Sequence, residues 1–285
     1  MTPLDWQALL FVPVGAERHL ASAIRNRPDA IILDLEDAVA PQSKAAARDV
    51  LKAAQAMIHA AGIACVLRVN AGVAAMVADL AAADHDRLDA IIVPKCEGTR
   101  LLRNAAELTA QKIPLVALIE SPAALNALPA LVAMPELSGL MLGSEDYSAL
   151  LGVDPDMGAL ETPTIQIANA AAGRGLLSIG FPGSIANFRD LDRYADQIAR
   201  GRALGMRAVA AIHPAQLPVI RQILAPTQAE VDWATQVVAR AAQLKALGQA
   251  VGAVDGMMID APVIARARRV LAAAKGREAN ATTTA

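Results

Sequence analysis

Short runs of β-branched and other apolar residues recur along the chain, and most of them end in an ionisable or otherwise reactive side chain. Eight such runs can be distinguished: Leu9–Pro13, Ala30–Asp37, Cys65–Asn70, Ala90–Lys95, Leu115–Glu120, Leu137–Asp146, Leu176–Gly180 and Ala208–Pro214. Most are separated by an Ala- and Leu-rich stretch that is long enough for one helix. Continuous apolar runs of this kind are typical of parallel strands that are buried on both faces. Eight strand–helix units in a chain of this length predict an α/β fold, a (β/α)₈ TIM barrel.

The composition agrees with one large domain and excludes several other classes of protein. Hydrophobic residues make up 55% of the 285 residues and aromatic residues only 2%, so aliphatic side chains must fill a sizeable core. Basic and acidic residues number 26 and 28 and form no basic run, so we expect no nucleic-acid partner. Apolar stretches are broken well before the ~18 residues that a membrane span requires, so we expect no membrane partner either.

The two cysteines, Cys65 and Cys96, lie in or just after predicted strands and lack the spacing of a metal site. The N-terminus lacks the pattern of a signal peptide. Reduced thiols and a cytoplasmic location are therefore expected.

The pattern changes after the eighth run. Thr227 and Glu230 form the sequence signature of a capping box, and the helix that starts there is expected to run to about Leu247. A Gly-rich turn region and a second helix to about Lys275 follow. A complete barrel needs no such addition, so this segment is expected to act as a lid or an oligomer contact. We predict three parts: a barrel catalytic domain over residues 1–222, a C-terminal helical lid over residues 223–275 and a disordered tail over residues 276–285.

Polar side chains gather at the predicted strand ends, where the active sites of such barrels lie. They are Glu36, Asp37, Arg68, Asn70, Lys95, Glu120, Glu145, Asp146 and His213. Glu120 and Asp146 end the fifth and sixth runs, and neighbouring strands lie roughly 4.8 Å apart. Two carboxylates so placed can share one Mg²⁺, with water and substrate oxygens completing the coordination. The alternative is that Glu120 caps the next helix and Asp146 pairs with a basic residue, but the many polar strand ends favour the metal.

Arg68 and Lys95 end the third and fourth runs and face the same predicted mouth. A guanidinium there can clamp a substrate carboxylate in bidentate fashion or neutralise a developing oxyanion. The competing interpretation, which is stronger for Lys95, is an ion pair at the barrel rim with a neighbouring carboxylate. His213 precedes a proline that holds its backbone extended, and it could serve either as a general base or as a structural hydrogen-bonding residue.

Several short motifs occur in order along the chain. They are LFVP at 10–13, LDLEDAVAP at 33–41, LRVN at 67–70, VPK at 93–95, LIES at 118–121, GSEDYS at 143–148, AIHPAQ at 211–216 and MIDAP at 258–262. Together they resemble the citrate lyase beta-subunit-like family of the HpcH/HpaI aldolase/citrate lyase superfamily, and the resemblance extends to about residue 275. The DLEDAV form is more similar to the lyase branch than to the pyruvate-aldolase branch.

The resemblance implies a Mg²⁺-dependent carbon–carbon lyase, with Mn²⁺ as an alternative ion, acting on a 3-hydroxy-acyl thioester of the citryl, malyl or citramalyl kind. Cleavage would release an acetyl thioester and a keto acid, and the thioester could be carried by coenzyme A or by an acyl-carrier group. By motif, Glu120 and Asp146 match the metal ligands, and Arg68 matches the arginine for the substrate carboxylate or oxyanion. The predicted site comprises Asp260, Arg68 and Glu36 as catalytic residues, Arg68, Glu120, Asp37, Lys95 and Gly143 as substrate-binding residues, and Glu120 and Asp146 as metal ligands.

Asp260 matches an aspartate that a neighbouring subunit delivers to the active site in related enzymes, where it would protonate the thioester enolate. The resemblance therefore implies a homo-oligomer, a trimer or a multiple of one. From the residues alone, Asp260 is instead the N-cap of the last helix, with Pro262 in its first turn.

The chain also departs from the family pattern. Gln7 and Ala8 stand where many relatives have Arg-Ser, Ser22 stands where Lys is common, and the seventh run lacks an aspartate that is often found there. We therefore expect a divergent substrate pocket. A 2-keto-acid aldolase or a thioester hydrolase on the same scaffold, and a non-catalytic subunit of a lyase complex, are the alternatives. The intact carboxylate pair weighs against the non-catalytic subunit.

Overall fold

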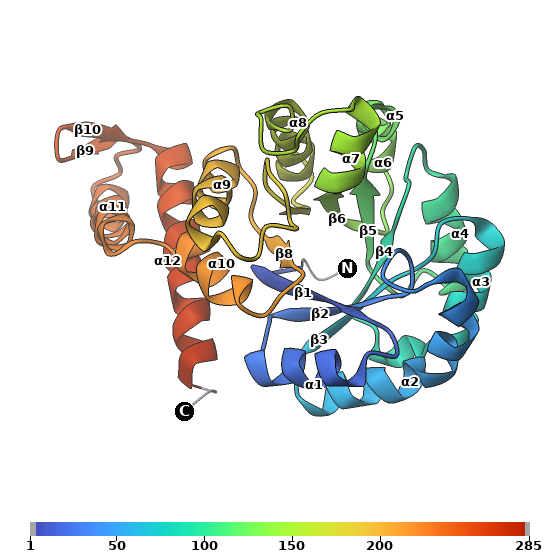
Figure 1. Cartoon of the computed structure of the whole chain (residues 1–285). Coiled ribbons are helices and arrows are strands. Elements are labelled where there is room, and N and C mark those ends of the chain that lie inside the picture. The colour runs from blue at the N-terminus through green and yellow to red at the C-terminus, as the bar shows by residue number, and fades with distance from the viewer. Residues whose placement is uncertain (1–3, 283–285) are drawn as a thin grey trace. The chain divides into compact units, whose positions relative to one another are not determined.

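The computed structural model describes residues 4–282, with side chains described up to Ala274. The chain forms two compact units, Met1–Leu224 and Ala225–Ala285, each with its own hydrophobic core (Figure 1). Within the described part of the chain, no helix has the length and apolar character needed to cross a membrane.

The first unit is built on a sheet of eight parallel strands, which helices surround (Figure 1). The strands are β1 (Ala8–Pro13), β2 (Ala30–Asp34), β3 (Ala64–Arg68), β4 (Ala90–Val93), β5 (Leu115–Ile119), β6 (Leu137–Leu142), β7 (Leu177–Ile179) and β8 (Val209–Ala211). They are hydrogen-bonded in the order β7-β6-β5-β4-β3-β2-β1-β8, and a bridge between Ile179 and Ala208 joins the two edges of the sheet. The predicted (β/α)₈ barrel is therefore confirmed.

Helices follow the strands, as the Ala- and Leu-rich stretches predict. They are α1 (Glu17–Asn26), α2 (Lys44–Ala60), α3 (Val73–Ala82), α4 (Arg100–Leu108), α5 (Pro122–Asn126), α6 (Leu128–Leu131), α7 (Ser144–Leu151), α8 (Glu161–Ala172), α9 (Leu191–Ala203) and α10 (Gln216–Leu224), with 3₁₀ turns at Pro41–Ser43 and His85–Arg87. Alternate residues of each strand serve two different cores. On β2, Ile31 and Leu33 pack in the core that the helices share, whereas Ile32 packs in a core made of strand residues, which is the barrel interior.

Seven of the eight predicted runs extend past the observed strand ends, and two of these differences move predicted site residues off their strands. β2 ends at Asp34, because the Asp34 side chain accepts hydrogen bonds from the backbone N–H groups of Glu36 and Ala38 and turns the chain. Glu36 therefore lies in the loop after β2 rather than on the strand. β6 ends at Leu142, before the sixth predicted run does. Asp146, the last residue of that run, therefore lies in the first turn of α7 rather than at a strand end.

The second unit contains two helices and a hairpin. These are α11 (Gln228–Ala246), the antiparallel strands β9 (Gly252–Val254) and β10 (Met257–Ile259), and α12 (Ala261–Thr282). The predicted capping box is confirmed, because the N–H of Glu230 donates to Thr227 Oγ1 at 3.2 Å and the N–H of Thr227 donates to Glu230 Oε2 at 2.7 Å. The small core of this unit comprises Ala234, Val237, Leu244, Ile259 and Ala267.

The helix α12 continues past Lys275, where the sequence predicts its end, to Thr282. The backbone is thus helical over residues 276–282, for which the sequence predicts disorder, and residues 283–285 of that predicted tail lie outside the described residues. Arg277, Glu278 and Ala279 are good helix formers that no proline interrupts, so the helix can propagate through them.

Candidate active site

The carboxyl groups of Glu120 and Asp146 lie together at the C-terminal end of the barrel strands. Glu120 directly follows β5 and is only 6% exposed, and its Oε2 accepts a hydrogen bond from the backbone N–H of Lys95 at 2.8 Å. The two carboxyl groups are close enough to share a hydrogen bond. Burial raises the pKa of Glu120 to about 8; the Lys95 N–H opposes this rise, and the charges of Glu36 and Asp146 add to it. Two acidic groups so placed compete for one proton, or share one cation.

Gly143 makes room for this arrangement. It stands between β6 and α7, and a Cβ atom added to it would lie 2.5 Å from Cγ of Glu120. Any larger residue would therefore displace the Glu120 side chain. This contact gives Gly143 a packing role; its substrate-binding role stays a prediction.

Arg68, the last residue of β3, is held by Asp34, the last residue of β2. Arg68 Nε donates to Asp34 Oδ1 at 2.7 Å, and Nη2 donates to Oδ2 at 2.7 Å. The remaining nitrogen, Nη1, lies 3.3 Å from Glu36 Oε2 and 3.8 Å from Asp37 Oδ2, and the guanidinium sits 5.0 Å from the centre of the Phe11 ring. Burial would lower the pKa of Arg68, but the hydrogen bonds and charge of Asp34 raise it. The edge of the guanidinium that carries Nε and Nη2 is therefore already occupied by Asp34.

Sequence reasoning missed Asp34. It is the second residue of the LDLEDAVAP motif that also contains Glu36 and Asp37, and it is 1% exposed. Asp34 and Arg68 are direct partners in the register of β2 and β3. The signal that could have found it is an aspartate and an arginine at matching ends of two neighbouring parallel strands.

Glu36 and Lys95 face each other beside this pair. Glu36 is 4% exposed, and neither of its oxygens has a hydrogen-bond donor among the described residues, although Lys95 Nζ lies 3.6 Å from Oε1. Burial raises the pKa of Glu36 to about 7, although Arg68 opposes the rise. Burial would lower the pKa of Lys95, but the nearby carboxylates, Glu36 first among them, raise it. Asp37, by contrast, is mostly exposed.

This mouth of the barrel contains more acid than base. Its carboxyl groups are those of Asp34, Glu36, Asp37, Glu120 and Asp146, and its cationic groups are those of Arg68 and Lys95. Arg68 is committed mainly to Asp34, and among the described residues neither Glu120 nor Asp146 forms a salt bridge, although the Lys95 charge lies near both. Oxygen donors without sulfur or imidazole suit Mg²⁺ or Mn²⁺. The described part of the chain offers no group of three or more His, Cys, Asp or Glu ligands. The residues therefore fit an ion that takes two protein ligands and leaves its other positions to water and substrate.

A second polar network fixes the loop after β3. Asp79 on α3 is fully buried and accepts hydrogen bonds from the backbone N–H of Asn70 at 2.7 Å, from Asn70 Nδ2 at 2.9 Å and from Arg48 Nε at 2.7 Å. Lys44 donates to Asn70 Oδ1. Lys44 and Arg48 lie one turn apart on α2. Asn70 thus serves this network, which supports the chain next to Arg68.

The other polar residues named from the sequence have different surroundings. Glu145 accepts hydrogen bonds from Ser184 Oγ at 2.7 Å and the Ile185 N–H at 3.0 Å. His213 Nδ1 accepts the N–H of Ala215 at 3.1 Å, and its ring stacks on Phe188. These contacts agree with the structural interpretation of His213.

Asp260 belongs to the second unit, where its Oδ1 accepts the N–H of Val263 at 3.3 Å and caps the start of α12. Its predicted catalytic role stays a prediction.

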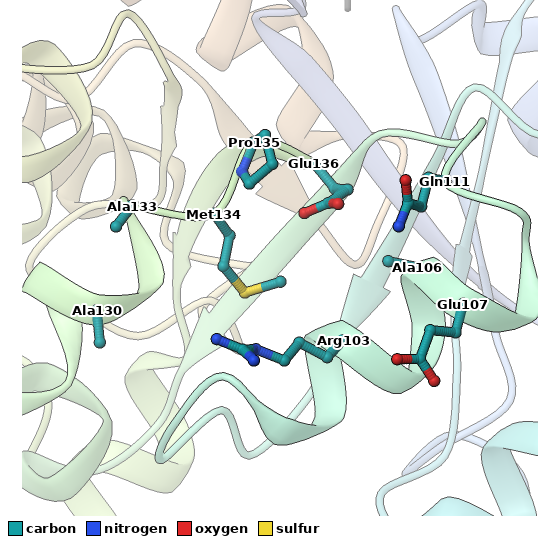
Figure 2. Close-up of a pocket in the computed structure, with 9 residues that line it drawn as sticks. All are labelled: Arg103, Ala106, Glu107, Gln111, Ala130, Ala133, Met134, Pro135 and Glu136. Carbon is teal, nitrogen blue, oxygen red and sulfur yellow. The ribbon is translucent and has the colours of Figure 1, made fainter.

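A pocket of about 330 Å³ lies away from these residues. Figure 2 shows the side chains that line it, which come from α4 and the turn after it, from α6 and from the turn before β6. It is lined by Arg103, Ala106, Glu107, Gln111, Ala130, Ala133, Met134, Pro135 and Glu136. Glu136 immediately precedes β6, so this pocket is at the N-terminal end of the strands and contains none of the predicted site residues.

The chain forms a parallel eight-stranded barrel with paired carboxyl groups and an anchored arginine at its C-terminal mouth, the end at which barrel enzymes have their active sites. The sequence matches the HpcH/HpaI aldolase/citrate lyase family over residues 7–214, and the chain belongs to that family.

Similar proteins cover almost the whole chain. A (3S)-malyl-CoA thioesterase of Cereibacter sphaeroides is 31% identical over 273 residues, which is 95% of either chain. A citrate lyase subunit beta-like protein of Deinococcus radiodurans is 31% identical over 278 residues, which is 94% of this chain and 97% of the relative. Among solved structures, CitE of Mycobacterium tuberculosis in complex with magnesium, acetoacetate and coenzyme A has a TM-score of 0.77 and 26% identity, and the match covers 95% of this chain and 98% of CitE.

Proposed function

We propose that the protein is a Mg²⁺-dependent carbon–carbon lyase. Its substrate would be a 3-hydroxy-acyl thioester such as citramalyl-, malyl- or citryl-CoA, cleaved to an acetyl thioester and a keto acid. The observation that carries the proposal is the buried Glu120 carboxyl beside Asp146 at the barrel mouth, where neither acid forms a salt bridge with any described residue. Support also comes from the CitE complex, which contains magnesium, a keto acid and coenzyme A.

Glu120 and Asp146 would hold the ion, with Mn²⁺ as an alternative to Mg²⁺. When bound, the ion supplies Lewis-acid stabilisation of substrate oxygens. Arg68 would bind a substrate carboxylate or oxyanion through Nη1, because Asp34 already occupies Nε and Nη2. Glu36, whose pKa is about 7, would accept the substrate hydroxyl proton near neutral pH. Lys95, Asp37 and Gly143 would complete the walls of the substrate site.

We propose that the protein works as a homo-oligomer, a trimer or a multiple of one, in the cytoplasm. The hairpin of the second unit exposes Met257 and Met258, each by more than half, and apolar surface of this kind usually contacts a partner. Asp260 follows this hairpin directly, and in the oligomer it would return a proton to the thioester enolate of a neighbouring copy. Cys65 and Cys96 are buried free thiols, as suits a reducing compartment.

A second candidate function is thioester hydrolysis, which the malyl-CoA thioesterase relative favours. One assay separates the two. With malyl-CoA and Mg²⁺, a lyase releases glyoxylate and acetyl-CoA, whereas a hydrolase releases malate and free coenzyme A. Glyoxylate is trapped as its phenylhydrazone, and the free thiol is measured with a disulfide reagent. Glyoxylate without free thiol supports the lyase, and free thiol without glyoxylate overturns it in favour of the hydrolase. Citramalyl- and citryl-CoA, tested in the same way, identify the acyl group.

A further inference from the structure

We infer that Asp34 is a positioning residue that sets the orientation of Arg68 for substrate binding. The inference rests on the proposed function, because it assigns Asp34 a part in that same site. Nothing in the chemistry of the carboxyl pair at Glu120 depends on Asp34, so the two assignments can fail separately.

The Asp34 carboxylate is saturated with donors. Its Oδ1 accepts Arg68 Nε and the backbone N–H of Glu36 at 2.9 Å, and its Oδ2 accepts Arg68 Nη2 and the backbone N–H of Ala38 at 3.2 Å. A carboxylate offers about four acceptor positions, so Asp34 has none left for a metal ion or a substrate. Asp34 can therefore act on the reaction only through the groups that it holds.

Two of the residues that it holds, Arg68 and Glu36, belong to the proposed substrate site. The paired hydrogen bonds fix the plane of the guanidinium, and the Phe11 ring supports one side of it. Only Nη1 and the outer hydrogen of Nη2 then remain available to a ligand. The same carboxylate also accepts the backbone N–H of Glu36. Asp34 thus holds both residues of the Arg68–Glu36 ion pair, in which Nη1 lies 3.3 Å from Oε2.

Lysine could not replace Arg68 in this arrangement, because an ammonium group cannot bridge both Asp34 oxygens and still present a third nitrogen. An asparagine at position 34 would keep the size of the side chain and one acceptor. Its amide nitrogen would meet the Arg68 Nη2 donor and break one arm of the fork. Asp34→Asn is therefore the variant that disturbs the orientation of Arg68 with the least disturbance of the fold.

Asp29, at the other end of β2, offers a matched control. It immediately precedes β2, and its carboxylate accepts the backbone N–H groups of Gln7 at 2.7 Å and Ala8 at 2.9 Å. Asp29→Asn removes the same charge from the other end of the strand but touches no group of the proposed site. Both substitutions should lower stability, and only Asp34→Asn should affect the reaction.

The experiment measures kcat and KM for malyl-CoA cleavage, and oxaloacetate affinity in the presence of Mg²⁺, in Asp34→Asn, Asp29→Asn, Arg68→Met and the double variant Asp34→Asn/Arg68→Met. We expect Asp34→Asn to lower kcat/KM about 100-fold, the size of loss that misplacing a positioned group produces. In the Arg68→Met background it should change kcat/KM by no more than about twofold, because the amide oxygen can still accept the Glu36 N–H and the remaining effect passes through Arg68. Asp29→Asn should also stay within about twofold of the unmodified protein. Mn²⁺ affinity, measured by electron paramagnetic resonance, should be unchanged in both aspartate variants.

The inference is overturned if Asp34→Asn remains equally harmful without Arg68, or if Asp29→Asn loses as much activity. If Asp34→Asn does not fold, nuclear magnetic resonance of the unmodified protein decides: the Arg68 Nε–H should exchange slowly with solvent, and rapid exchange would exclude a persistent Asp34 bond. If the unmodified protein cleaves none of the thioesters, the proposed function fails. Oxaloacetate affinity then still tests Asp34, because Asp34→Asn should weaken it and Asp29→Asn should not.

Discussion

Carboxylates lie at both ends of the barrel strands, but their surroundings differ. At the N-terminal ends, Asp29 accepts two backbone N–H groups at the start of β1, and Asp89 accepts the Cys65 N–H at 2.8 Å. At the C-terminal ends, Glu36 has no hydrogen-bond donor within the described residues, and Glu120 shares its surroundings with a second acid. Burying an acid without a matching partner costs free energy.

This difference in hydrogen-bond partners separates acids with a structural role from acids that are expected to take part in the reaction. Asp29 and Asp89 join neighbouring strands and leave the C-terminal mouth untouched. Glu36 and Glu120 are buried with their pKa values raised to about 7 and about 8, and buried acids with raised pKa values cluster at functional sites. Substituting an acid should therefore lower mainly turnover at the C-terminal end of the barrel and mainly stability at the N-terminal end.

The largest expected effect is at Glu120. Glu120→Ala should lower Mg²⁺-dependent turnover about a thousandfold, since it removes a proposed metal ligand. Stability should fall little, because removing an acid that burial disfavours offsets the lost Lys95 N–H hydrogen bond. Asp89→Ala should do the reverse: it should lower the free energy of unfolding by about 1–3 kcal/mol and leave turnover nearly unchanged. Steady-state kinetics and urea unfolding of the two variants measure both quantities. Normal turnover of Glu120→Ala at limiting Mg²⁺ would break the comparison.

A smaller loss is expected at Gly143. The added methyl group of Gly143→Ala would push the Glu120 side chain aside, so turnover should fall about 100-fold and the Mg²⁺ requirement should rise. Gly98→Ala is the control, because a Cβ there meets nothing within 4 Å. Metal titrations of activity in the two variants check the prediction. If both variants had the same turnover and the same Mg²⁺ requirement, a Cβ at position 143 would not displace the Glu120 side chain, contrary to the structure.

Subunit mixing should restore only part of the full activity, but it tests Asp260 directly. Glu120→Ala and Asp260→Ala are each expected to be inactive, and one copy of each can form a complete site only if Asp260 acts on a neighbouring copy. Random exchange in a cyclic oligomer should restore about a quarter of full activity. Exchange is verified by native mass spectrometry. If proven exchange restores nothing, Asp260 serves only as the cap of α12.

The sequence predicts the strands well because a buried parallel strand is a continuous apolar run, and the capping box at Thr227 because it depends on residues three positions apart. It predicts the strand ends poorly. Side-chain hydrogen bonds of Asp34 end β2, and the helix start at Ser144 places Asp146 off the strand. Asp34 escaped notice as a site residue for a related reason: its pairing with Arg68 depends on the register of two strands, which the order of residues does not reveal.

The smallest expected effect concerns the pH dependence of stability. The pKa of Glu36 is raised from its usual 4.5 to about 7, mainly by burial. The folded state therefore binds this proton more tightly than the unfolded state, and the free energy of unfolding should decrease as pH rises between those two values. Above this range the penalty is fully present, and it is worth at most about 3 kcal/mol. Glutamine has no charge to bury, so Glu36→Gln should raise the melting temperature by several degrees at about pH 8 and change it little at about pH 5.

Asp89→Asn is the counterpart at the other end of the barrel. The Cys65 N–H keeps only a weaker acceptor there, so this substitution should lower the melting temperature at about pH 8, where Glu36→Gln raises it. Thermal unfolding is followed by circular dichroism at both pH values, with chelator present so that divalent ions do not stabilise the folded state. An equal shift for Glu36→Gln at the two pH values would mean that Glu36 is not a buried acid with a raised pKa. A stabilising Asp89→Asn would mean that the acids at the two ends of the barrel do not differ as their partners indicate.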